Sequence, residues 1–185
     1  DENQTSIGTV TASDQDGDTL TFSIIDGDTE LSINSSSGVL VFNIIPDYET
    51  KPRYPPVGAN GEAYTVRVSD GTNSTNQSLV INIVNLNDNS PVITSSATFS
   101  ADENQTTIGT VTASDADGDT LIFSSSDTNI PINSSSGVLS FATAPDFEVQ
   151  NTYTVTITAS DGIPGRAGTN STTQEITITI NDLDD

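Results

Sequence analysis

The chain has 185 residues, enough for one large domain or two of ordinary size. Four Lys and Arg residues stand against 26 Asp and Glu residues, and this net charge of -22 argues against nucleic acid or anionic lipid as a partner, since both need a basic surface. Cys, His, Trp and Met are absent. Thiol and imidazole chemistry is therefore excluded, which leaves oxygen ligands, the kind that Ca²⁺ and Mg²⁺ prefer.

Alternating apolar and polar residues predict strands along the whole chain. In the clearest case, Tyr153, Val155 and Ile157 alternate with threonines, as in a strand with one buried face. Gly, Asn, Asp and Ser clusters separate such segments about every ten residues, and no segment has helical periodicity. The pattern predicts an all-β chain with about seven short strands per ~95 residues, which is typical of a β-sandwich. In chain order, strands are expected at 64–69, 108–113, 121–123, 153–159 and 176–180.

An internal repeat divides the chain into two tandem domains, predicted at 1–88 and 89–185. DENQTSIGTVTASDQDGDTLTFS at 1–23 recurs as DENQTTIGTVTASDADGDTLIFS at 102–124, and INSSSGVL at 33–40 recurs at 132–139. Extra residues fall where loops are expected. The first domain carries them after Glu49, in TKPRYPPVGANGEA, and the second after Asp161, around GIPGRAGTN.

The segment 85–91, NLNDNSP, joins the two repeats. It is short and contains one Pro, unlike a flexible Gly/Ser linker. The second domain begins with an expected strand at 92–99 that has no counterpart in the first, so the first domain either has an open edge or takes its first strand from elsewhere. The abrupt opening at Asp1 leads us to expect that the chain is a piece of a longer protein.

Carboxylates gather at loop positions instead of scattering over one surface. DQDGD at 14–18 and DADGD at 115–119 each place three of them within five residues. One copy would fit an ordinary acidic turn, but repetition in register across both domains favours a hard cation with six to eight oxygen ligands. An EF-hand loop is excluded because its twelfth position would be Ile25 or Ser126 instead of Glu. The same alternation of acids occurs in PDYE at 46–49 and PDFE at 145–148.

The order of these motifs resembles the cadherin repeat, twice and over essentially the whole chain. DEN, DYE or DFE, ASDQD or ASDAD, VSDG or ASDG, and the linker NLNDNSP occur in the family's order. The Ser- and Thr-rich composition and the DGD ending are more similar to bacterial cadherin-like repeats than to animal ones. The resemblance implies two seven-stranded Greek-key, immunoglobulin-like β-sandwiches in an elongated rod, stiffened by about three Ca²⁺ at the junction.

The resemblance also implies a ligand set drawn from both domains and the linker. These ligands would be Glu2, Asp47, Glu49, the Leu86 carbonyl, Asn87, Asp88, the Asn89 carbonyl, Asp115, Asp117 and Asp161. The shortened DGDT loop leaves one carbonyl ligand unassigned, with Asp119 as the candidate replacement, and Asn85 stands where the linker pattern begins with Asp. Partial sites are implied at the two ends, from Glu103, Asp146, Glu148 and Asp185 and from Asp14, Asp16 and Asp70.

Three functions remain open. The first is a calcium-binding adhesion module at a cell surface, within a larger secreted or anchored protein, with homophilic or other surface-protein contacts. It cannot use exchange of a Trp-anchored strand, because the chain has no Trp. The second is a calcium-stiffened spacer of a large bacterial surface adhesin. The third is a carbohydrate-binding accessory module with Tyr54 as its exposed aromatic. An enzyme is not expected, since the paired acids are accounted for as metal ligands.

Overall fold

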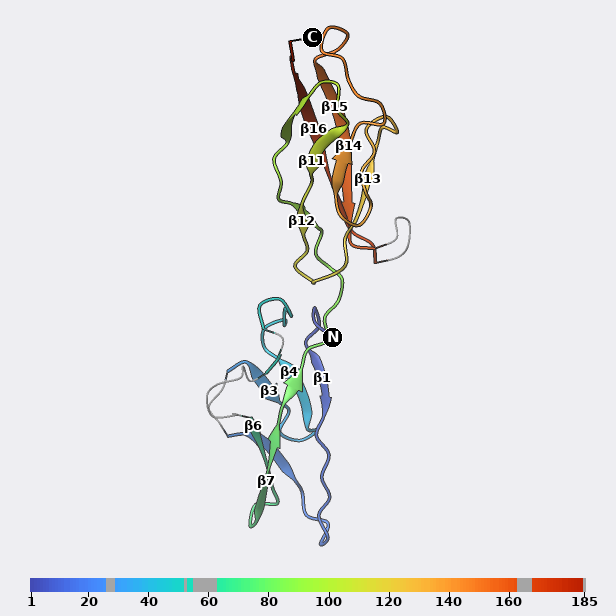
Figure 1. The fold of residues 1–185 in the computed structure, drawn as a ribbon. Helices are drawn as coiled ribbons and strands as arrows, with labels where there is room; N and C mark the ends of the chain where they lie inside the picture. The colour runs from blue at the N-terminus through green and yellow to red at the C-terminus, as the bar shows by residue number, and fades with distance from the viewer. Residues whose placement is uncertain (26–28, 52, 55–62, 163–167, 185) are drawn as a thin grey trace. The chain divides into compact units, whose positions relative to one another are not determined.

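The computed structural model describes residues 1–25, 29–51, 53–54, 63–162 and 168–184, with Arg53 and Tyr54 described by their backbone alone. The chain divides into two compact units, Asp1–Leu86 and Asn87–Asp185, two residues before the predicted boundary. Over these ranges all regular structure is β, which confirms the all-β class (Figure 1). In the part of the chain described, no helix has the length and hydropathy of a membrane span.

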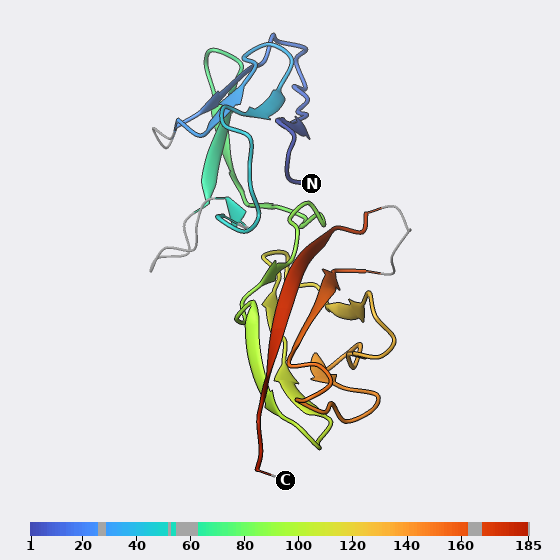
Figure 2. The same cartoon turned by 90° about the horizontal axis from the view of Figure 1, so that it is seen from above.

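The second unit is a sandwich of two β layers. One layer is a four-stranded sheet in the order β10–β16–β15–β13, in which β10 runs parallel to β16 (Figure 2). The opposite layer combines the pairs β9–β12 and β11–β14 with a bridge between Ile132 and Leu139. The strands are β9 (Val92–Ile93), β10 (Thr98–Asp102), β11 (Thr107–Thr110), β12 (Ala113–Ser114), β13 (Ile122–Ser125), β14 (Val138–Ser140), β15 (Thr152–Ser160) and β16 (Ser171–Asn181).

Two of the expected strands of this unit are interrupted. The expected strand at 92–99 crosses between the layers, since β9 pairs with β12 and β10 pairs with β16. The expected strand at 108–113 breaks at Val111, whose N–H donates to the carbonyl of Gly137 at 2.9 Å in the turn before β14. Apolar alternation predicted both segments, but it carries no information about which neighbour each half pairs with.

The core of the second unit lies between its two layers. Leu139 from one layer and Ile157, Ile176 and Ile178 from the other are fully buried. Since burying such side chains contributes about 1.5–3 kcal/mol each, these apolar faces hold the layers together.

The first unit repeats this plan with a smaller buried cluster among the residues described. Leu31, Phe42, Tyr64 and Ile83 form its centre. Its sheets are β1–β4–β3, β2–β6–β7 and β5–β8. The strands are β1 (Ser6–Thr9), β2 (Thr21–Ile24), β3 (Leu31–Ile33), β4 (Val39–Phe42), β5 (Arg53–Tyr54), β6 (Tyr64–Ser69), β7 (Ser74–Leu79) and β8 (Ile81–Asn82).

The extra residues of the first unit interrupt a strand. Tyr54 of β5 pairs with Ile81, and Tyr64 of β6 pairs with Leu79. Between these two pairs the chain advances by ten residues, from 54 to 64, whereas the antiparallel partner segment changes by only two residues, from 81 to 79. In the second unit the uninterrupted β15 makes the matching pairs. The insertion thus divides the equivalent of β15 in two, a position that the Pro-rich sequence did not reveal.

The two units differ mainly at the outer edge of β7, where the second unit has the additional strand β10 on the equivalent strand β16. In the second unit, a Cβ on Gly109 would lie 2.8 Å from the ring of Phe99, which β10 places against the strand. At Gly8, the equivalent position, a Cβ would meet nothing within 4 Å. A cavity of about 290 Å³, lined in part by Thr9, Val66 and Leu79, lies at this edge. No described residue of the first unit takes the place of β10.

The turn in the INSSSGVL segment requires glycine at the same position in both units. Gly137 has φ 71°, and a Cβ there would lie 2.1 Å from the carbonyl oxygen of Val111; Gly38 is in the same situation against Val10. The side-chain oxygen of Asn133 fixes the turn by accepting the N–H groups of Ser135 and Ser136.

We predict that Gly137→Ala destabilises the second unit by about 3 kcal/mol, because left-handed strain of about 1–2 kcal/mol adds to a backbone clash. Gly168→Ala is the matched control, since Gly168 has φ 78° and a Cβ there would meet no described residue within 4 Å. It should cost only the strain of about 1–2 kcal/mol. Denaturant unfolding of both variants measures the difference, and equal losses would mean that the turn relaxes.

An ion pair in the first unit joins Lys51 to Glu30. The Lys51 ammonium donates to the carboxylate of Glu30, which also accepts the Tyr64 hydroxyl at 3.0 Å. The hydrogen bond from Lys51 is the main cause that lowers the pKa of Glu30 below its ordinary value, against an opposing effect of burial.

Because the folded pKa of Glu30 is depressed, its contribution to stability is present above about pH 4.3 and is lost as the pH falls through the folded pKa. The pair is partly exposed, so we expect less than about 1 kcal/mol. Glu30→Gln should flatten the acid limb of the first unit's unfolding curve, measured by thermal melts between pH 6 and pH 3. An unchanged acid limb would show that the pair contributes nothing.

Candidate metal centres

Each unit holds a buried glutamate near the start of its repeat. Glu2 and Glu103 are both 2% exposed. Glu2 accepts the N–H groups of Tyr48 and Leu86 at 2.7 Å each. Glu103 accepts those of Phe147 and Leu183 at 2.9 and 2.8 Å. Each glutamate therefore fixes two distant segments of its unit and turns them toward one carboxylate.

The asparagine of the DEN motif has a structural reason that the sequence analysis did not identify. Asn3 and Asn104 have φ of 62° and 60°, a left-handed conformation that Asn tolerates better than most residues. Their N–H groups donate to the carbonyls of Pro46 and Pro145. This connects the DEN motif to the PDYE or PDFE motif of the same unit, and the recurrence of Asn after each Glu was the available signal.

These connections assemble a trio of acids in each unit. One carboxylate oxygen each from Glu2, Asp47 and Glu49 lies within 4.8 Å of the others, and Glu103, Asp146 and Glu148 form the same trio. The Thr50 hydroxyl, followed by the Thr50 N–H, lowers the pKa of the exposed Asp47. Asp146 accepts the equivalent N–H, from Val149, at 3.2 Å.

The trios are costly without a cation. Two unit charges 4.8 Å apart repel by about 3 kcal/mol at an effective dielectric near 20. The chain has four Lys and Arg residues against 26 Asp and Glu residues, so its basic side chains are too few to neutralise its acid clusters. A hard divalent ion would convert this repulsion into attraction, and the all-oxygen donor set fits Ca²⁺ or Mg²⁺.

The DADGD loop of the second unit forms another group. Oxygens of Asp115, Asp117 and Asp119 lie within 4.8 Å of one another. Asp115 Oδ1 accepts the Asp117 N–H at 2.9 Å, and the 6% exposed Asp161 accepts the Asn170 N–H at 2.7 Å.

The second oxygens of two of these carboxylates carry the argument for a metal. Asp115 Oδ2 and Asp161 Oδ2 are buried and accept no hydrogen bond within the described residues. An uncompensated buried carboxylate oxygen is expensive. A cation in contact with each of these oxygens would remove this penalty, so the chemistry of both residues fits the metal that the sequence implies. Of the two, only Asp115 belongs to a group of described acids within 4.8 Å of one another.

The linker residues that belong to the second unit, residues 87–89, form hydrogen bonds with Asp117 and Asn170 of that unit. Asp117 Oδ2 accepts the N–H groups of Asp88 and Asn89 at 3.2 and 2.9 Å. The side-chain amide of Asn170 donates to Asn87 Oδ1 at 2.7 Å and to the Asn89 carbonyl at 3.1 Å. Asn170 was not among the predicted site residues, although the recurrence of Thr-Asn-Ser at 72–74 and 169–171 was a usable signal.

The equivalent acids of the first unit are arranged differently. Asp14 Oδ1 accepts the N–H groups of Asp16 and Asp18, as in the second unit. Asp70 accepts the N–H of Asn73 at 2.5 Å, as Asp161 accepts that of Asn170, and it also accepts the N–H of Thr72 at 2.7 Å; the bond from Asn73 is the main cause that lowers the pKa of Asp70. Among the described residues, Asp14, Asp16 and Asp70 do not form a trio like those above. Asp185, expected in the other partial site, lies outside the described residues.

The chain is similar to proteins of a known domain family. Residues 95–181 match the Cadherin domain family. Over 98% of its length the chain is 33% identical to the mouse cadherin EGF LAG seven-pass G-type receptor 2, and over all of it 30% identical to Drosophila melanogaster cadherin-99C. The chain spans only 6% and 11% of these relatives. These relatives are animal proteins and do not confirm the bacterial type that the composition suggested.

Solved structures agree on the fold. Human protocadherin-24 EC1-2 superposes with a TM-score of 0.79 at 17% identity, covering 98% of this chain and 90% of that one. Mouse cadherin-23 EC22-24 gives 0.77 at 24% identity, covering 98% and 62%. Residues 95–181 therefore resemble a cadherin domain, and the relatives that align over nearly the whole chain support the presence of cadherin repeats, while the solved structures agree with the fold.

Proposed function

We propose that this chain is a calcium-binding adhesion module of an extracellular, cell-surface protein, stiffened by Ca²⁺ where its two repeats join. The observation that carries the proposal is a pair of buried oxygens, Asp115 Oδ2 and Asp161 Oδ2, that have no donor among the described residues, in the unit whose Asp117 holds the linker residues. The trio of Glu2, Asp47 and Glu49 would supply the other ligands.

The linker supports this proposal from both units. Its peptide N–H groups donate to Glu2 at Leu86, within the first unit, and to Asp117 at Asp88 and Asn89, within the second. Calcium that takes six to eight oxygens from both acid sets and from linker carbonyls would restrict the joint. About three ions would nearly neutralise the acids proposed as ligands, and extracellular modules bind Ca²⁺ at about 10⁻⁴–10⁻³ M.

Small-angle scattering with saturating Ca²⁺ and with chelator tests the proposed stiffening. We expect a narrower distribution of interatomic distances with a longer, defined maximum dimension in Ca²⁺, because shared ligands restrict the joint. The double variant Asp115→Asn/Asp161→Asn should give the chelator profile in both conditions, while Glu175→Gln, an exposed acid on β16, serves as control. Identical wild-type profiles in the two conditions would refute stiffening.

A calcium-stiffened spacer of a large surface adhesin is the second candidate, because it uses the same ions and asks for no contact by this chain. Sedimentation in Ca²⁺ separates the two roles: concentration-dependent dimers indicate homophilic adhesion, whereas a monomer up to millimolar concentration favours a spacer. A carbohydrate-binding role has less support, since the side chain of Tyr54, its expected aromatic, lies outside the described residues.

A further inference from the structure

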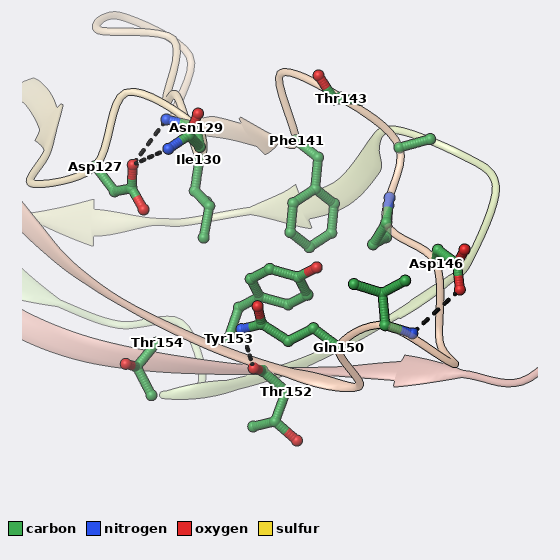
Figure 3. Close-up of a pocket in the computed structure, with 13 residues that line it drawn as sticks. Asp127, Asn129, Ile130, Phe141, Thr143, Asp146, Gln150, Thr152, Tyr153 and Thr154 are labelled. Carbon is green, nitrogen blue, oxygen red and sulfur yellow. Dashed lines mark hydrogen bonds between the residues drawn. The ribbon is translucent and has the colours of Figure 1, made fainter.

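The second unit contains a cavity of about 580 Å³ at the end opposite the DADGD loop. Figure 3 shows Asp127 and Asn129 at one end of it, Asp146 at the other, and the rings of Phe141 and Tyr153 between them. The two rings meet edge to face, with centroids 5.0 Å apart. No basic residue lines the cavity within the described part of the chain, which favours a neutral or cationic occupant over an anion.

The first unit shows what occupies the equivalent place there. The carbonyls of Glu30 and Asn129 accept matching N–H groups, from Asn43 and Ala142. The N–H groups of Lys51 and Gln150 likewise donate to the carbonyls of Asp47 and Asp146. The backbones therefore correspond, and the position that faces Asn129 in the second unit is filled in the first by the ammonium of Lys51, paired with Glu30.

The second unit has lost both members of this pair. Gln150 donates its side-chain amide to the Thr152 carbonyl at 2.8 Å, and Asn129 donates its own to Asp127 Oδ1 at 3.1 Å. Neither of these hydrogen bonds joins position 129 to position 150, as the ion pair joins the equivalent positions 30 and 51 in the first unit. A carboxylate is nevertheless retained, because Asp127 stands next to the place of Glu30, and Figure 3 shows its second oxygen turned away from the Asn129 donors.

We propose that this cavity binds a lysine or arginine side chain of a partner protein, in the place that the first unit fills with its own Lys51. The cation would contact Asp127, and its alkyl stem would lie against Tyr153, where a cation–π contact is available within about 6 Å of the ring. Asp146 belongs to a trio that we assign to calcium, so it is not counted as a contact. The net charge of -22 would attract a basic partner segment over a longer range.

Amide chemical shifts of the full chain test this, with Nα-acetyl-L-lysine methylamide as the probe and saturating Ca²⁺ present. We expect shifts confined to residues 127–130, 141–146 and 149–154, with a dissociation constant on the order of 1–10 mM, since one ion pair and one ring contact are weak. The neutral isostere Nα-acetyl-L-norleucine methylamide should bind at least about fivefold more weakly, and methyl α-D-mannoside should leave these amides unchanged.

Two variants make the test specific. Asp127→Asn keeps an oxygen for the Asn129 donors and should weaken lysine binding at least about fivefold. Asn129→Glu/Gln150→Lys rebuilds the ion pair of the first unit and should abolish binding, with unshifted amides elsewhere showing that the unit is folded. Glu175→Gln should have no effect. The proposal is overturned if the neutral isostere binds as well as lysine, if only the mannoside binds, if lysine shifts no amide of the cavity, or if both pocket variants bind like the wild type.

Discussion

Replacing Glu103 with alanine is expected to destabilise the second unit by about 3–5 kcal/mol even in chelator. The carboxylate accepts the N–H groups of Phe147 and Leu183 while 2% exposed. Hydrogen bonds to a charged acceptor contribute about 1.5–3 kcal/mol each, and Glu103→Ala would remove the acceptor of both donors. Urea unfolding in EGTA measures the loss without any contribution from calcium.

Glu103→Gln is the graded control for this prediction. It keeps the size of the side chain and one acceptor oxygen, so about half of the loss should remain. Glu2→Ala should act in the same way on the first unit, through Tyr48 and Leu86. A loss below about 1 kcal/mol for Glu103→Ala would mean that the buried glutamate serves metal binding alone.

The double variant Asp115→Asn/Asp161→Asn is expected to act in opposite directions with and without calcium. In chelator it should stabilise the second unit by about 2–4 kcal/mol, because two buried oxygens with no donor among the described residues become amide groups and two negative charges disappear. The accepting Oδ1 atoms are retained for Asp117 and Asn170. In saturating Ca²⁺ it should instead be less stable than the wild type.

Thermal melts of wild type and variant in both conditions measure this inversion. Removal of two charged ligands should also weaken calcium binding at least about a hundredfold, since each contributes several kcal/mol of Coulomb attraction. Glu175→Gln, outside the cluster, should change neither melt. If the variant is destabilised equally in chelator and in calcium, the two aspartates have a structural role unrelated to metal.

The repeated acidic motifs and the strands with alternating apolar residues could be predicted from the sequence. Period-two segments such as 153–159 are strands, because one apolar face per strand is enough to specify a sandwich layer. The buried glutamates and the acid trios were found because each motif occurs twice. Pairing partners were beyond this reasoning, since alternation alone does not show that β10 runs parallel to β16 while β9 joins β12.

Contacts between segments far apart in sequence were also beyond prediction. Asn170 holds Asn87 and Asn89 across a separation of more than 80 residues, and its recurrence in Thr-Asn-Ser marks the position without showing which residues it contacts. The same holds for Lys51 and Glu30, whose loss in the second unit leaves a cavity. Single polar contacts depend on exact placement, whereas strands depend on a pattern that many residues share.

Isothermal titration of the chelator-treated chain with CaCl₂ tests the central claim most directly. We predict saturable uptake of about three ions with midpoints near 10⁻⁴–10⁻³ M, and loss of the tightest of them in Asp115→Asn/Asp161→Asn. A titration that shows no heat beyond dilution, or uptake that the double variant leaves intact, would contradict the assignment of these carboxylates to calcium.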